Sequence, residues 1–199
     1  MSGYVVSSIP QTEQGFTIIE LLIALAMTGV IFGAVCSFLI VQRRTHAAQE
    51  QTTHMVQRAR AAMDLMGYEL QMAGYNPRRV AFEGISYHTS QLEFRADLNG
   101  NGTTAEAEET INYTYDATQR RLLRDAGTGV EPLSDHIQAF MWEYLDANGT
   151  PTTAAANIRQ IRLAITTRTA KSDPLYQSNG GYRTYTLTSV ITPRNLAYR

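Results

Sequence analysis

A run of oxygen-bearing side chains between residues 97 and 108 has the spacing of a calcium-binding loop. Asp97, Asn99 and Asn101 stand at every second position, a glycine follows at 102, and Glu108 comes six residues later, as in the pattern D-x-[DN]-x-[DN]-G-x5-E. Carboxylate and amide oxygens are the ligands that calcium prefers, and the glycine permits a sharp turn. The expected ligands are Asp97, Asn99, Asn101, Thr103 and Glu108.

A second interpretation of this loop requires no metal. Ala105 at the ninth position would need a water molecule as the ligand, and the flanking residues alternate like strands instead of forming helices. A polar hairpin with a turn at Asn99-Gly100 accounts for the same residues. If calcium binds, two formally charged ligands predict a weak affinity, about 10⁻⁴–10⁻³ M. The sequence therefore predicts either no cofactor or calcium at this loop.

Glu20 is a second residue whose surroundings demand an explanation. Residues 21–41, which follow it, contain no charged side chain, and a helix of this length spans about 32 Å, the thickness of a bilayer's hydrocarbon core. A carboxylate at the end of such a helix costs about 2.5–3.5 kcal/mol to insert. It therefore needs a partner group, unless the side chain reaches back to the lipid headgroups.

The spanning segment predicts a membrane helix that approaches other helices closely. Gly29 and Gly33 form a G-x-x-x-G motif, which brings helix backbones together. The segment is too long for the apolar region of a signal peptide. Arg43 and Arg44 follow it, and by the positive-inside rule alone they would favour a cytoplasmic C-terminal side.

The helix is predicted to continue beyond the membrane. Residues 42–73 contain no proline, and small or apolar side chains recur there at helical spacing, at Met55, Ala59, Ala62, Met66, Leu70 and Ala73. Gly74 and Asn76-Pro77 then provide a stop. We expect one helix from Phe16 to Ala73, about 58 residues or about 87 Å long, with a transmembrane lower half and an amphipathic upper half.

After Pro77 the pattern alternates with the period of β-strands. The expected strands are 80–87, 91–95, 110–115, 120–124, 137–144, 158–167 and 182–191. Asn-Gly turns at 99–100 and 148–149, and Asn179-Gly180-Gly181, separate several of them. Because closely spaced strands pair antiparallel, the sequence predicts an α+β protein with one antiparallel sheet packed on the helix.

Composition argues against several classes of protein. Seventeen basic and eighteen acidic residues give a net charge of −1, which is unlike a generally basic nucleic-acid binder, so no nucleic-acid partner is expected. Cys36 is the single cysteine and excludes an intramolecular disulfide. The four histidines are scattered, and no H-E-x-x-H or nucleophile motif is present. We therefore do not expect an enzyme.

The string Gly15-Phe16-Thr17-Ile18-Ile19-Glu20, followed by the apolar segment, resembles the processing site of type IV prepilins and type II secretion pseudopilins. The resemblance implies that a prepilin peptidase cuts between Gly15 and Phe16 and N-methylates Phe16. It also implies that Glu20 meets the N-terminal amine of Phe16 of a neighbouring subunit during assembly. The implied partners are other pilin or minor pilin subunits, the peptidase, the membrane and the inner-membrane assembly platform.

Three further strings, 66–77, 92–100 and 193–196, resemble PilW-type minor pilins. This resemblance implies a minor type IV pilin, a structural subunit that initiates or primes the pilus and enters the filament. The alternatives are a J-type pseudopilin of type II secretion, or a membrane-anchored calcium-binding or sensing domain that never polymerises. The absence of a cysteine pair argues against a major pilin.

The predicted organisation has four parts. Residues 1–15 are the leader, 16–41 the transmembrane half of the helix, 42–76 its amphipathic half, and 77–199 a β-rich head. The resemblance implies a single-pass inner-membrane protein with a periplasmic head before assembly, and a place in the pilus at the cell surface afterwards.

Overall fold

The protein is described here from a computed structural model, in which residues 15–196 are placed. The chain divides into two compact units, residues 1–47 and 48–199. Among residues 15–196, one α-helix precedes all the strands. The elements are α1 (Ile18–Gln71), β1 (Ile85–Ser86), β2 (Gln91–Arg95), β3 (Thr110–Asp116), β4 (Arg121–Asp125), β5 (Val130–Asp135), β6 (Ile137–Leu145), β7 (Gln160–Arg168) and β8 (Thr184–Ile191), with short 3-10 helices at Ala155–Asn157 and Ser178–Gly181.

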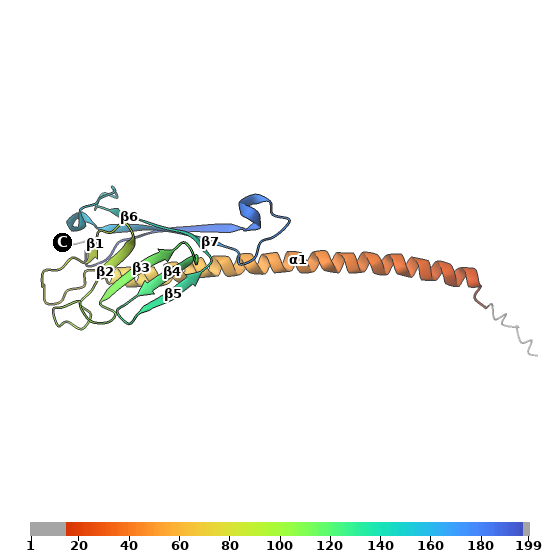
Figure 1. Cartoon of the computed structure of the whole chain (residues 1–199), viewed down its shortest axis with the longest axis horizontal. Helices are drawn as coiled ribbons and strands as arrows, with labels where there is room; N and C mark the ends of the chain where they lie inside the picture. Colours follow the sequence, from red (N-terminus) through yellow and green to blue (C-terminus); the bar gives the residue numbers. More distant parts are fainter. Residues whose placement is uncertain (1–14, 197–199) are drawn as a thin grey trace, which may run out of the picture. The chain divides into compact units, whose positions relative to one another are not determined.

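α1 is drawn as a single long helix in Figure 1. Its N-terminal part exposes apolar side chains. Its most apolar window has a mean hydropathy of 2.4 and none of it is buried, so by length and composition this helix can cross a membrane. The hydroxyls of Thr28 and Ser37 donate to the carbonyls of Ala24 and Gly33, 2.7 and 2.9 Å away, in the preceding turns. These bonds satisfy the polar groups without a partner chain.

The C-terminal part of α1 buries the stripe that the sequence predicts. Met55, Ala59, Ala62, Met66 and Leu70 are all buried, with at most 2% of each residue exposed. The regular helix stops at Gln71, two residues before the predicted end, because residues 72–74 form a turn that closes with a positive φ of 77° at Gly74.

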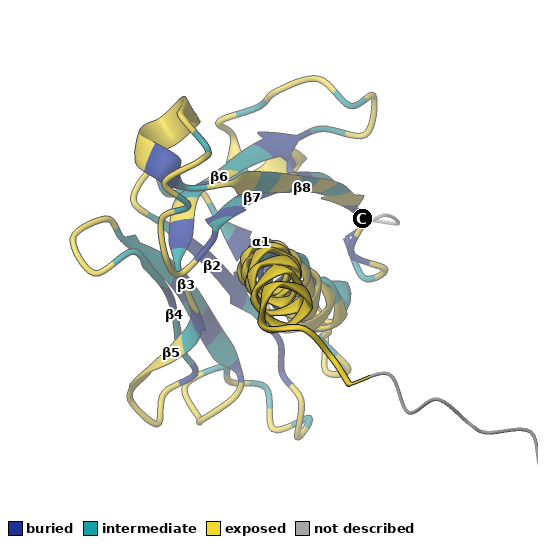
Figure 2. Cartoon of the chain, turned by 90° about the vertical axis from the view of Figure 1, so that its right-hand side faces the viewer, coloured by how far each residue is buried: buried dark blue, intermediate teal, exposed yellow. Residues whose placement is uncertain are grey.

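The strands form two antiparallel sheets instead of the predicted single sheet. The first has the order β1-β2-β3-β4-β5 and the second the order β6-β7-β8. The division falls at His136, the one residue between β5 and β6, whose positive φ of 59° turns the chain out of the first sheet. Viewed along α1, the two sheets lie around the buried end of the helix (Figure 2). The α+β class is confirmed.

Two strands depart most from the prediction, and the other bounds agree to within two residues. The predicted strand 80–87 contributes only Ile85–Ser86, paired with Phe94 and Glu93 of β2. Strand β5 was not predicted, because Val130–Asp135 contains Pro132 and little hydrophobic alternation. Proline is tolerated there because β5 is the edge of its sheet.

The turn that ends α1 packs against Leu196, close to the C-terminal end of the described residues. Leu196 is 5% exposed and belongs to the core. A Cβ atom built on Gly74 would lie 2.6 Å from Leu196 Cδ2, and one built on Gly84 would lie 2.5 Å from the Cα of Gly74. Both positions therefore need glycine for this close approach.

Candidate functional site

The predicted processing site lies just before α1. Gly15 and Phe16 precede the first helical residue, Ile18, and Phe16 is 86% exposed. A Cβ atom built on Gly15 would meet nothing within 4 Å. The peptide bond between these two residues is therefore accessible within the described chain. The rest of the predicted leader, residues 1–14, lies outside the described residues.

Glu20 and Thr17 form a capping box at the start of α1. The Thr17 backbone N–H and hydroxyl donate to Glu20 Oε2 over 2.9 and 2.8 Å, and the Glu20 N–H donates to Thr17 Oγ1 over 3.3 Å. This reciprocal arrangement satisfies N–H groups that the first helical turn leaves without partners. This role of Glu20 was not predicted, although the T-x-x-E signal was present in the sequence. Glu20 thus has a partner in its own chain.

The helix surface beyond Glu20 is apolar and open. Phe32, Phe38 and Val30 are 68%, 66% and 74% exposed, and nothing lies within 4 Å of a Cβ atom built on Gly29 or Gly33. Such a surface is stable only when lipid or other apolar helices cover it.

The loop after β2 turns around its own polar side chains. Asp97 Oδ2 accepts from the Gly102 N–H over 3.0 Å. Asn99 Oδ1 accepts from the Asn101 N–H over 2.8 Å, and Asn101 Oδ1 from the Thr103 N–H over 2.7 Å. Four of the five predicted calcium ligands therefore lie in one compact turn, with Asp97 fully buried.

Glu108, the fifth predicted ligand, points elsewhere. Its φ is 67°, and its Oε2 lies 2.5 Å from Arg124 Nη2 of β4. The neighbouring Glu109 turns toward the loop instead, where its Oε1 accepts from the N–H groups of Leu98 and Asn99 over 3.1 and 3.3 Å. Within residues 15–196, no group of three or more His, Cys, Asp or Glu side chains is close enough together to hold a metal ion.

A second carboxylate of α1, Glu69, is buried in the head. Its Oε1 accepts from Arg124 Nε over 2.9 Å and lies 2.7 Å from Arg124 Nη2, while Oε2 accepts from the Tyr113 hydroxyl. Burial, the hydrogen bond to Glu69 and its negative charge all raise the pKa of Tyr113 well above its ordinary value. Burial lowers the pKa of Arg124, but its bonds to Glu69 and Glu108 outweigh that effect and raise it. The periodicity of the helix gave no signal for this polar cluster.

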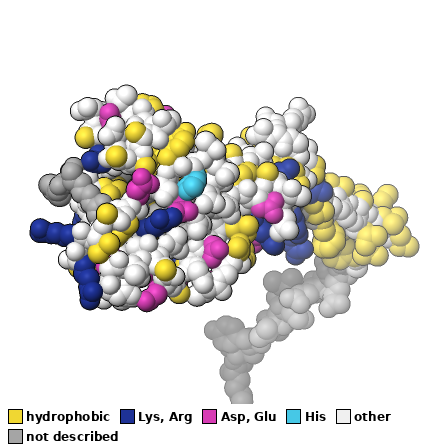
Figure 3. Space-filling view, turned by 60° about the vertical axis from the view of Figure 1, so that its left-hand side comes forward, with side chains coloured by type: hydrophobic (Ala, Val, Ile, Leu, Met, Phe, Trp, Pro, Cys, Tyr) yellow, Lys and Arg dark blue, Asp and Glu magenta, His cyan; other side chains and the backbone are white. Residues whose placement is uncertain are grey.

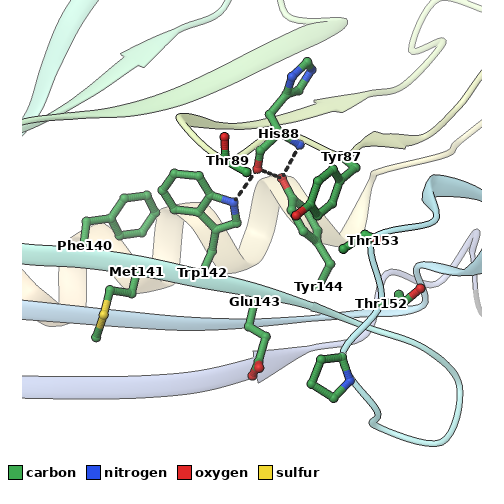
Figure 4. Close-up of a pocket in the computed structure, with 11 residues that line it drawn as sticks. Tyr87, His88, Thr89, Phe140, Met141, Trp142, Glu143, Tyr144, Thr152 and Thr153 are labelled. Carbon is green, nitrogen blue, oxygen red and sulfur yellow. Dashed lines mark hydrogen bonds between the residues drawn. The ribbon is translucent and has the colours of Figure 1, made fainter.

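An aromatic groove of about 500 Å³ lies between β6 and the loop after β1. Phe140, Trp142 and Tyr144 point into it from one face of β6 (Figure 4). The Trp142 Nε1–H and the Tyr144 hydroxyl donate to the carbonyl of His88 over 3.3 and 3.2 Å. These hydrogen bonds hold the loop after β1 against β6.

Charged side chains of the second sheet are used in local contacts. Arg162 pairs with Glu143 on the neighbouring strand, Arg183 pairs with Asp173 at 3.2 Å, and the guanidinium of Arg168 lies 4.0 Å from the centre of the Tyr182 ring. The face of the head in Figure 3 mixes acidic, basic and hydrophobic side chains. On this face, charges of both signs are therefore interspersed.

Comparison with known proteins agrees with the N-terminal features. Residues 11–35 match the family model of the prokaryotic N-terminal methylation motif. A type IV-like pilin from Thermus thermophilus aligns with 16% sequence identity and a TM-score of 0.45, over 71% of this chain and 97% of that one. No curated protein matches.

The matched residues include Gly15, Phe16 and Glu20 and run into the apolar part of α1. Here that helix continues into an α+β head with antiparallel sheets. The chain therefore carries the prokaryotic N-terminal methylation motif at the start of a long apolar helix.

Proposed function

We propose that the protein is a minor type IV pilin, which enters the filament and helps to start its assembly. The observation that carries this proposal is the methylation motif at the exposed start of an uncovered apolar helix. Packing against the helices of other subunits would cover that surface, and Gly29 and Gly33 would allow a close approach. Resemblance of residues 66–77, 92–100 and 193–196 to PilW-type subunits favours a minor pilin over a J-type pseudopilin.

The capping box suggests how Glu20 takes part in assembly. Cleavage after Gly15 would turn the backbone nitrogen of Phe16 into an ammonium group. Within its own chain, Glu20 Oε2 already accepts hydrogen bonds from the backbone N–H and the hydroxyl of Thr17. The Oε1 atom is then the oxygen that faces a neighbour's Phe16 ammonium. In a low-dielectric bilayer this attraction is far less screened than in water.

The proposed function also implies the other partners of the protein and its location before and after assembly. The peptidase processes the chain in the inner membrane, α1 anchors it there with the head in the periplasm, and the assembly platform then moves it into the pilus. The head carries no part of the cleavage site, because Gly15 and Phe16 precede the helix.

Processing is tested by intact-mass measurement of protein purified from its native membrane. A chain of 184 residues that begins with methylated Phe16 is expected. A full-length chain recovered beside an active peptidase would contradict cleavage at this bond.

Assembly is tested with Glu20→Gln, which keeps the shape and removes the charge. Cleavage should persist because Gly15 and Phe16 are unchanged, and insertion should be no worse because a neutral amide costs less to bury. The amount in sheared filaments should fall, relative to the membrane fraction, and overexpression should not restore it. Normal incorporation of the variant would show that Glu20 acts only within its own chain. Loss of type II secretion with intact pili in a deletion strain would instead assign the protein to the secretion system.

A further inference from the structure

Two buried carboxylates of the head have no compensating cation. Asp97 is 0% and Glu109 is 3% exposed. Within residues 15–196, neither forms an ion pair with a Lys, Arg or His side chain. A charged group buried in a protein is normally paired or bound to a metal, because its desolvation is costly. The two carboxylates therefore call for a positive charge that the described chain does not supply.

Each carboxylate also has one oxygen without a hydrogen-bond donor. Asp97 Oδ1 and Glu109 Oε2 are buried and unpartnered. Their other oxygens, Asp97 Oδ2 and Glu109 Oε1, accept from backbone N–H groups of residues 98–102. Both carboxylates are thus oriented by the same turn, and each keeps one oxygen for another ligand.

We propose that Asp97 and Glu109 bind a calcium ion in the loop 97–109. Glu109, one position beyond the closing residue of the sequence pattern, takes the place of Glu108, whose carboxylate is committed to Arg124. The amide oxygens of Asn99 and Asn101 complete the protein ligands, together with water. This site is independent of the proposed role in pilus assembly, because it lies wholly within the head.

The chemistry of the donors selects calcium among the common cations. The loop offers carboxylate and amide oxygens and no imidazole or thiolate, which disfavours zinc and copper. Calcium accepts six to eight oxygens in flexible geometry, whereas magnesium requires a near-ideal octahedron and keeps most of its water. Glu106 acts as a positioning residue, since its two oxygens accept from the side-chain amides of Asn99 and Asn101 over 2.6 Å each.

The bound ion would fasten the loop to the end of α1. The Asp97 N–H donates to the carbonyl of Tyr75 over 2.9 Å, and the Ala96 N–H to the carbonyl of Glu109 over 2.8 Å. The Gly74 N–H donates to the carbonyl of Arg95 over 2.8 Å. Calcium would therefore stabilise the junction between α1, β2 and β3.

The first test is thermal unfolding of the full chain in detergent micelles, followed by tryptophan fluorescence. At about 10⁻⁴–10⁻³ M affinity, 5 mM CaCl₂ should raise the Tm above that in EGTA by about 3–6 °C. The same concentration of MgCl₂ should raise it by about 1 °C or less. An equal Tm in CaCl₂ and EGTA would overturn the proposal, and so would an equal response to both metals.

The second test compares Glu109→Gln with its matched neighbour Glu108→Gln. Glu109→Gln should abolish the calcium increment, whereas Glu108→Gln should keep it. In EGTA, Glu109→Gln should unfold at the same or a higher temperature than the unchanged protein, because it removes an uncompensated buried charge. A merely structural role of Glu109 would instead lower the Tm equally with and without calcium. That result, or loss of the increment in Glu108→Gln alone, would overturn the proposed ligand set.

Discussion

Glu20 and Glu69 are carboxylates near the two ends of the same helix, and their surroundings differ in every respect. Glu20 is exposed and bonds to Thr17, three residues away. Glu69 is 9% exposed and bonds to Tyr113 and Arg124, which lie on β3 and β4. The first carboxylate completes a local turn, whereas the second joins the helix to a sheet.

The two carboxylates therefore contribute to the stability of different parts of the molecule. A cap is worth about 1 kcal/mol and acts on the first turn alone. A buried charge bonded to two distant strands contributes to the whole head, because removing one member leaves the others uncompensated. We therefore expect Glu69 to govern stability and Glu20 to govern contacts outside its own chain.

The largest expected effect is that of Glu69→Ala. This change leaves Arg124 with Glu108 alone and removes the acceptor of the buried Tyr113 hydroxyl. The free energy of unfolding of the head should fall by about 3 kcal/mol, or about 6–12 °C in Tm. Glu20→Ala is the matched control on the same helix and should change the head's Tm by about 1 °C or less. The Tm is measured by circular dichroism in micelles. An equal loss of Tm in the two variants would contradict the difference between Glu69 and Glu20.

The next effect is a dependence of stability on alkaline pH to which Tyr113, beside Glu69, contributes. The pKa of Tyr113 is raised in the folded protein by burial and by Glu69, while the unfolded side chain ionises near its ordinary value of 10. Above pH 10 the unfolded state therefore binds fewer protons than the folded state. The contribution of Tyr113 to the free energy of unfolding is fully present below pH 10. It should fall by about 1.4 kcal/mol for each pH unit above that.

Tyr113→Phe should remove this contribution to the slope. Denaturant unfolding between pH 9 and 11 measures it, with Tyr68→Phe as the control because Tyr68 is 65% exposed. Identical slopes in the unchanged protein and Tyr113→Phe would refute the assignment.

The smallest effect concerns the capping box. Thr17→Ala removes the hydroxyl that accepts from the Glu20 N–H but keeps the carboxylate. Loss of a cap of about 1 kcal/mol should accelerate hydrogen exchange of the Glu20 amide about fivefold. Incorporation into filaments should stay near normal, in contrast to Glu20→Gln. If Thr17→Ala abolished incorporation while the exchange rate stayed unchanged, the local role of Thr17 would be wrong.

Regular periodicity explains which parts of the fold could be predicted. The stripe from Met55 to Leu70 and the alternation of Ile111 and Tyr113 both follow from repeated burial of one face, and both are buried as expected. The division into two sheets could not be predicted, because it depends on a left-handed conformation at His136, a residue with no special turn signal.

The candidate sites show the same limit on a smaller scale. The capping box is local in sequence and was available from the spacing of Thr17 and Glu20. The cluster of Glu69, Tyr113 and Arg124 joins residues 55 positions apart, so no local pattern contains it. In the loop, Glu108 has a positive φ and its carboxylate contacts Arg124, whereas the carboxylate of Glu109 contacts the loop. A pattern with fixed spacing cannot predict which of two adjacent glutamates faces the loop.

The contact between Gly74 and Leu196 joins two segments that are synthesised far apart in time. Gly74 leaves the ribosome 122 residues before Leu196, which at about 5–20 residues per second is a delay of about 6–24 s. Other residues of the same core, such as Leu92 and Tyr113, are synthesised well before Leu196. Closure of the core at the C-terminal end of α1 is therefore the last packing step that synthesis allows.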